Sequence, residues 1–141
     1  MTKIVYAGQD LTTDQGNSLL NIVQMFGDGC EAHFGDVNIH NQMFHQIVSA
    51  LGRFYIVAHP STGSERISYQ PYVLQHVWPE QTPYDRDREL ISLANVLISC
   101  PPSENGVDWM QQAWNMVRLA QVNNVNHFVI LPSGTVRIKL Y

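Results

Sequence analysis

The chain alternates short β-rich runs with longer stretches in which apolar residues recur at helical spacing. The short runs predict strands at Lys3 to Gly8, Cys30 to Phe34, Phe54 to Ala58, Val96 to Cys100 and Phe128 to Leu131. The longer stretches predict helices at Thr13 to Phe26, Asn41 to Leu51, Asp85 to Ala94 and Gly106 to Asn123. Thr12 or Thr13 is the expected N-cap of the first helix. This alternation is typical of an α/β fold, so we expect a Rossmann-like, open, mostly parallel sheet of about five strands flanked by helices.

Two segments depart from the alternation. Residues 60 to 83 are rich in proline and show no clean period, although Tyr72 to Val77 is a candidate short strand. Thr135 to Leu140 alternates apolar and polar residues after a Ser133-Gly134 turn, which predicts a C-terminal edge strand. Because the chain contains no internal repeat, low-complexity tract or linker, residues 1–141 are expected to form a single domain.

Composition and charge narrow the class of partner. Charged residues make up 14% of the chain, well below the usual quarter or so, and we expect a homo-oligomer in which some surface is covered. The net charge of −4 argues against nucleic acid or an anionic membrane as the main partner. The two cysteines form no CxxC pair, and Cys100 is expected to be a buried reduced thiol. With no secretory signal and no apolar run long enough to span a membrane, a cytoplasmic location is expected.

Candidate chemistry is expected at the carboxyl ends of the strands, where ligands of open parallel sheets bind. Four loops lie there: Gly8-Gln9-Asp10, Gly35-Asp36, His59 to Gly63 and Pro102 to Gly106. Phosphate would suit such loops because free helix amides and the helix dipole stabilise anions. Neither GxGxxG nor GxxxxGK[ST] is present, however, so Gly8 has an equally simple interpretation as a tight-turn residue.

Individual side chains in or near these loops have competing interpretations. Arg86 and Arg88 are suited to bidentate contact with phosphate, or else pair with the neighbouring acids on a solvated helix start. Arg66 is a further candidate, and His59 follows a strand, where a general acid or ligand donor is useful. The histidines at positions 33, 40 and 45 match no metal motif, so neither a metal nor another cofactor is expected. Trp109 and Trp114 are expected to serve packing or an oligomer interface, with ligand stacking as the other possibility for Trp114.

Taken in order, these loops resemble the SLOG superfamily, which includes the LOG-type phosphoribohydrolases and the molybdenum-cofactor carrier-like proteins. The resemblance spans nearly the whole chain. It is carried by Ala7-Gly8-Gln9-Asp10, Gly35-Asp36 with Ile39-His40-Asn41 and His45, His59-Pro60-Ser61, Pro83-Tyr84 with Arg86-Asp87-Arg88-Glu89, and Trp114 to Gln121. It implies a Rossmann-like nucleotide-binding domain whose ligand contacts fall on these marks.

The departures from that family concern the residues that perform its catalysis. The Pro-Gly-Gly-x-Gly-Thr-x-x-Glu motif of the LOG enzymes is absent, and Gln112-Ala113 stands where relatives have Gly-Thr. Glu104 and Asp108 lie nearby but do not occupy the place of the family's glutamate. The resemblance therefore implies binding more than bond cleavage.

Three functions are left open. The leading expectation is binding of a nucleotide or nucleotide-derived phosphorylated molecule, as sensor, carrier or sequestering protein. Its expected contacts are Gly8, Gln9, Asp10, Gly35, Asp36, His59, Arg66, Arg86, Arg88 and Trp114. The first alternative is hydrolysis of an N-glycosidic bond in a nucleoside monophosphate, with Asp36, Glu104 or Asp108 as the acid. The second is a degenerate fold used as a homo-oligomeric interaction or structural protein.

Overall fold

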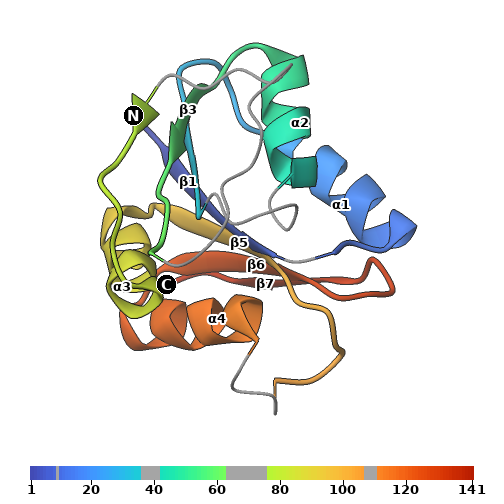
Figure 1. The fold of residues 1–141 in the computed structure, drawn as a ribbon. Helices are drawn as coiled ribbons and strands as arrows, with labels where there is room; N and C mark the ends of the chain where they lie inside the picture. Colours follow the sequence, from blue (N-terminus) through green and yellow to red (C-terminus); the bar gives the residue numbers. More distant parts are fainter. Residues whose placement is uncertain (9, 36–41, 63–75, 107–110) are drawn as a thin grey trace.

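A seven-stranded sheet forms the centre of the molecule in the computed structural model, with strand order β4-β3-β2-β1-β5-β6-β7 (Figure 1). The structure describes residues 1–8, 10–35, 42–62, 76–106 and 111–141. The first six strands are parallel and β7 is antiparallel to β6. The strands are β1 (Lys3–Gly8), β2 (Glu31–Phe34), β3 (Tyr55–Ala58), β4 (His76–Val77), β5 (Val96–Cys100), β6 (Asn126–Ile130) and β7 (Val136–Lys139). The predicted α/β class with an open, mostly parallel sheet is confirmed.

Helices cover both faces of the sheet, two on each side (Figure 1). They are α1 (Thr13–Gln24), α2 (Gln42–Leu51), α3 (Pro83–Leu93) and α4 (Gln112–Val122). Because successive strand residues point to opposite faces, Ile4 and Tyr6 of β1 pack under α1 and α2, whereas Val5 and Ala7 pack under α3 and α4. Burial on both faces explains why the central strands are almost entirely apolar.

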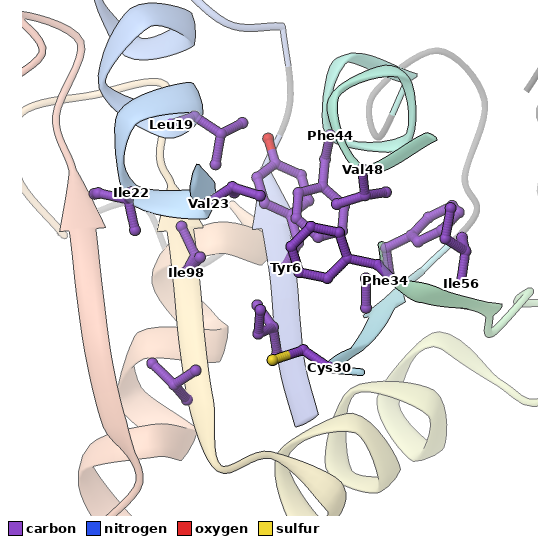
Figure 2. Packing of buried hydrophobic residues seen from close by; sticks show 14 of the residues in the cluster. Tyr6, Leu19, Ile22, Val23, Cys30, Phe34, Phe44, Val48, Ile56 and Ile98 are labelled. Carbon is purple, nitrogen blue, oxygen red and sulfur yellow. The ribbon is translucent and has the colours of Figure 1, made fainter. Parts of the chain in front are cut away.

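The larger of the two cores lies under α1 and α2 (Figure 2). At its centre the Tyr6 ring stacks on Phe44, with ring centroids 4.5 Å apart and planes inclined by 3°. Phe34 meets Phe44 edge-on at 6.0 Å. These aromatic contacts join β1, β2 and α2 into one packed unit.

Most differences from the predicted elements are at their ends. The predicted C-terminal edge strand is present as β7, and the sheet exceeds the expected strands only by the two-residue β4 at its other edge. The candidate strand Tyr72 to Val77 survives as β4 only at His76–Val77, since residues 72–75 lie outside the described part. The longest predicted helix is shorter than expected, because α4 begins at Gln112 and Gly106 lies in a turn.

Capping explains where two helices begin. Thr12 caps α1, its Oγ1 accepting from the Gln15 amide at 3.0 Å, while Gln15 Oε1 accepts from the Thr12 amide at 3.1 Å. Thr82 caps α3, which begins two residues before the predicted Asp85 because Pro83 occupies the first turn. None of the helices in the described part of the chain is long and apolar enough to cross a membrane.

Candidate functional site

The sheet reverses its direction of winding between β1 and β5. From β1 the chain adds β2, β3 and β4 on one side, then returns to place β5, β6 and β7 on the other. In open α/β sheets, the crevice beyond the carboxyl ends at such a reversal is where ligands bind. The two loops at this reversal follow Gly8 of β1 and Cys100 of β5, which are register partners, and we refer to the position between these loops as the crevice.

Gly8 has no room for a side chain. A Cβ at this position would lie 2.1 Å from the Tyr6 hydroxyl and 3.2 Å from the Cys100 Cβ. The glycine is therefore required by the phenol beneath it, whether or not a ligand approaches from above. This gives the predicted site residue Gly8 a structural role.

Tyr6 and Cys100 lie directly under the crevice as neutral groups. Burial, with the neighbouring Cys100, raises the pKa of Tyr6 well above its usual value, and burial raises the pKa of Cys100 to about 12. Cys100 is thus a buried, reduced thiol, as predicted, with little thiolate for nucleophilic chemistry. No nitrogen or oxygen atom of the described residues forms a hydrogen bond with the Tyr6 hydroxyl.

Gln15 joins α1 to the loop after β5 and to the end of β6. The sequence did not predict this contact. Gln15 Nε2 donates to the carbonyl of Pro101 at 2.7 Å and to that of Ile130 at 3.0 Å. The side chain is 1% exposed, so these bonds form away from water. The Thr12-x-x-Gln15 spacing is that of a capping box and was the available signal.

The loop after β5 is held by Trp114. Its ring lies 3.3 Å from where a Cβ on Gly106 would stand, and its Nε1 donates to Ser103 Oγ at 3.2 Å. Arg118 donates to the Gly106 carbonyl and to Asn115 Oδ1. Trp114 is otherwise packed into the core under α4. These contacts of Trp114 are those of a packing residue, which is one of the two roles predicted for it from the sequence.

A chain of hydrogen-bonded titratable groups runs along β2 to the end of β3. Glu31 Oε1 lies 2.9 Å from His33 Nε2, and His33 Nδ1 lies 2.8 Å from His59 Nε2. With Glu31 as an acceptor, His33 carries its proton on Nε2 and accepts from His59 Nε2–H. His59 Nδ1 then holds a lone pair, and this buried atom has no hydrogen-bond partner in the described part of the protein.

His59 is uncharged at neutral pH. Burial is the main cause of its lowered pKa of about 3, with smaller contributions from His33, Arg86 and His76. The pKa of His33 is also lowered by burial, although Glu31 opposes the change. A neutral acceptor does not attract phosphate, so the arrangement favours a hydrogen-bond donor beside His59.

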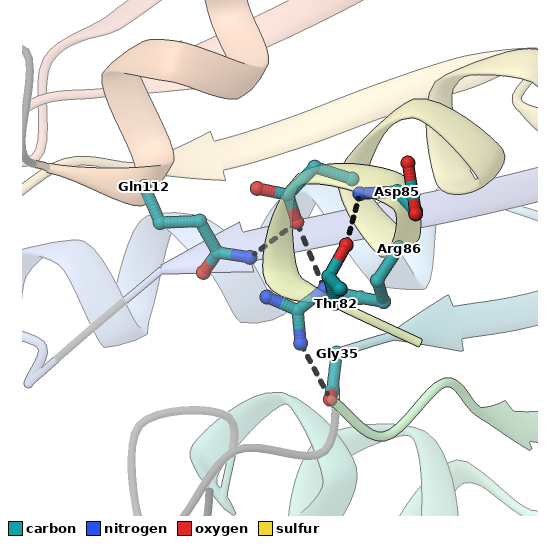
Figure 3. A network of polar contacts seen from close by, with 6 residues as sticks. Gly35, Thr82, Asp85, Arg86 and Gln112 are labelled. Carbon is teal, nitrogen blue, oxygen red and sulfur yellow. Dashed lines mark hydrogen bonds and ion pairs between the residues drawn. The ribbon is translucent and has the colours of Figure 1, made fainter. Parts of the chain in front are cut away.

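Arg86 is the polar link between α3 and the end of β2 (Figure 3). Its Nη1 donates to the Gly35 carbonyl at 3.0 Å and its Nε to Asp87 Oδ1 at 2.9 Å. Gln112 Nε2 donates to the same Asp87 oxygen at 3.0 Å, joining α4 to the network. A Cβ at Gly35 would lie 2.8 Å from Arg86 Nη1, so a side chain there would displace the guanidinium from this network.

The two arginines of the predicted pair do not come together. Arg86 is 3% exposed and bonded inward, whereas Arg88 is exposed on the outer side of α3. Arg88 Nη1 donates to the Tyr84 hydroxyl at 2.8 Å, and its guanidinium lies over the Tyr84 ring at 5.3 Å. The two guanidinium groups therefore have separate sets of partners.

The other predicted site residues divide into two groups. Asp10 and Glu104 are exposed on the two loops that border the crevice. Gln9, Asp36, Arg66, His40, Asp108 and Trp109 lie outside the described residues. Within the described part, no cluster of three histidine, cysteine or acidic side chains is arranged to hold a metal ion.

The N-termini of α1, α3 and α4 differ at this edge. Threonines cap α1 and α3, and Asp14 and Asp85 add negative charge to their first turns. α4 has neither: its N-cap residue, Gln111, makes no side-chain capping bond, and its first turn contains no acid. The first-turn amides of α4 are therefore the best suited of the three to an anion.

The geometry defines a doubly wound α/β protein whose strand order reverses between β1 and β5. Comparisons with protein-family models, with curated proteins and with solved structures found no match.

Proposed function

We propose that the protein binds a nucleotide or a nucleotide-derived phosphorylated molecule in the crevice between the loops after β1 and β5. The observation that carries the proposal is that α4, whose N-cap makes no side-chain capping bond and whose first turn contains no acid, begins at the point where the sheet reverses its winding. A phosphate placed there would accept from the first-turn amides of α4. The resemblance to SLOG domains supports the same class of ligand.

The remaining chemistry of the edge favours binding over catalysis. The Cys100 thiol is protonated and His59 is a neutral acceptor, so neither is an activated nucleophile or a charged acid. Glu104 is exposed on its loop. We therefore assign the site to a sensor, carrier or sequestering role. The buried, unpaired cysteines are consistent with work in the reducing cytoplasm.

Isothermal titration against nucleoside mono-, di- and triphosphates, cyclic nucleotides and NAD-derived species tests this proposal. The informative variant is Gln111→Asp, which supplies α4 with a side-chain cap and a negative charge together. We expect a more stable fold, by about 0.5–1 kcal/mol, because aspartate is a preferred N-cap. Phosphate binding should weaken by about tenfold or more, since the carboxylate competes for the same amides.

Thr82→Asp is the matched control. It adds the same charge at the same edge but at α3, which already has a cap. Affinity should stay within about twofold of the unchanged protein, because a carboxylate at position 82 caps α3 and does not compete for the first-turn amides of α4. Equal losses in both variants would place the ligand elsewhere, and no binding to any member of the panel would end the proposal.

A further inference from the structure

A groove of about 240 Å³ lies between α4 and the β6–β7 hairpin, away from the crevice. Its walls include the cations Arg137 and Lys139 and the rings of Trp114 and Tyr141, and they contain no carboxylate side chain. The protein as a whole has 12 acidic residues against 8 lysines and arginines. The groove is a local positive region on a negative protein.

Among the described residues, neither cation of the groove has an anionic partner. Neither Arg137 nor Lys139 forms an ion pair within the described residues, and Lys139 is engaged only by the Tyr141 ring, whose centroid lies 5.4 Å from its Nζ. Both are exposed. Their register partners, Val129 and His127, place the two side chains on the α4 face of the sheet.

β7 also presents an open backbone edge, since β6 is its one neighbour among the strands of the described residues. The Leu131 amide donates to the Thr135 carbonyl at 2.9 Å, which sets the hydrogen-bonding phase of the hairpin. By the alternation of antiparallel ladders, Arg137 and Lys139 direct their backbone groups toward β6. Val136, Ile138 and Leu140 direct theirs outward, and the side chains of Ile138 and Leu140 are 59% and 66% exposed.

We propose that β7 is a docking edge for an extended acidic segment of a partner protein, which adds to the sheet as a further strand. Main-chain hydrogen bonds to the outward groups of β7 would supply affinity, as in other cases of strand addition. Side chains two apart on one face of a strand are roughly 7 Å apart. Alternate acidic residues on the incoming strand therefore match the spacing of Arg137 and Lys139.

Charge decides against a second copy of this chain as the occupant. Antiparallel self-pairing centred on Ile138 would set Arg137 of one copy opposite Lys139 of the other, and like charges in that position are destabilising. Cations on an edge strand also discourage pairing with neutral or basic strands. An acidic strand avoids the repulsion between like charges and is attracted to the cations of β7, so it is the occupant that the charges favour.

Fluorescence anisotropy with a labelled peptide of alternating glutamate and valine tests the proposal, with the alternating lysine–valine peptide as its charge-reversed control. We expect the acidic peptide to bind and the lysine–valine peptide not to bind. Arg137→Gln should weaken binding of the acidic peptide by about threefold, as for loss of one exposed ion pair, and the matched Arg88→Gln should not. Equal effects of the two substitutions would overturn the proposal, as would failure of the acidic peptide to bind.

The role of the backbone is tested separately. Ile138→Pro removes an outward amide that β6 does not use, and edge strands tolerate proline. An acidic peptide N-methylated at alternate residues makes the same test with the protein unchanged. Each should lower affinity by about tenfold.

Unchanged binding of the methylated peptide would mean attraction by charge alone and would overturn the proposal. So would displacement of the peptide by inorganic phosphate at matched ionic strength. A dimer in analytical ultracentrifugation that Ile138→Pro dissociates would identify a second copy as the occupant and overturn it as well.

Discussion

His59 illustrates how one neighbour sets the chemistry of a residue. The sequence places it at the end of a strand, where an acid or an anion ligand would be useful. In the structure, His59 donates its Nε2–H to His33 Nδ1, and burial lowers the pKa of His59 to about 3. The side chain is therefore a neutral acceptor across the physiological range.

This neutral state makes the fold sensitive to acid. The unfolded chain binds a proton at position 59 below about pH 6.5, whereas the folded protein binds none until about pH 3. Stability is therefore complete above pH 6.5 and falls as the pH drops through that window. We expect His59 alone to lower the free energy of unfolding by about 2 kcal/mol between pH 8 and pH 5.

Urea unfolding of the protein and of His59→Gln at both pH values measures this. The pH-dependent loss should shrink in His59→Gln and persist in the control, His76→Gln, whose side chain is exposed. The same pH dependence in all three proteins would show that His59 is not the cause.

Substitutions of Arg86 and Arg88 should have different effects on the free energy of unfolding. Arg86→Met leaves the Gly35 carbonyl without its donor and Asp87 without its cation, so we expect a loss of about 2–3 kcal/mol. Arg88→Met should change stability by less than about 0.5 kcal/mol, because its contacts are exposed. Thermal or urea denaturation gives both values, and a mild effect of Arg86→Met would argue against the network in Figure 3.

At the scale of elements, Gln15 fastens α1 to β5 and β6. Gln15→Leu has a similar volume but leaves two buried carbonyls without donors, and we expect it to cost about 2–4 kcal/mol. Gln24→Leu, at an exposed position near the other end of α1, is the matched control and should be nearly neutral. If the two variants unfold at the same urea concentration, Gln15 does not join these elements.

The order and type of the elements could be predicted because each strand and helix carries its own hydrophobic period. Thr12 and Gln15 even show the local signature of a cap. The sites of polar contact could not be predicted in the same way. Arg86 bonds to a carbonyl 51 residues earlier, and the choice between that contact and a solvated helix start depends on tertiary packing. The separation of Arg86 from Arg88 has the same origin, because two residues apart on a helix point to different sides.

At the scale of the whole molecule, self-association is still a prediction, but the structure suggests a different surface for it than the one around the helix tryptophans. Trp114 is buried within the protomer, so it does not form an exposed aromatic face. Exposed apolar residues instead occur on the outer side of α3 and α4, where Tyr84 is 66% and Val122 81% exposed. Sedimentation velocity should show an oligomer that Val122→Glu dissociates, and a monomer at all concentrations would contradict this.

The central claim is that the crevice at β1 and β5 is where a phosphorylated ligand binds. A ¹⁵N–¹H correlation spectrum recorded during titration with the best-bound member of the nucleotide panel tests it most directly. We predict saturable shifts at the amides of Gly8, Ser103 and Gln112, with none at the opposite edge near Asn95 and Asn124. Shifts confined to the opposite edge, or no shifts at millimolar ligand, would contradict the account.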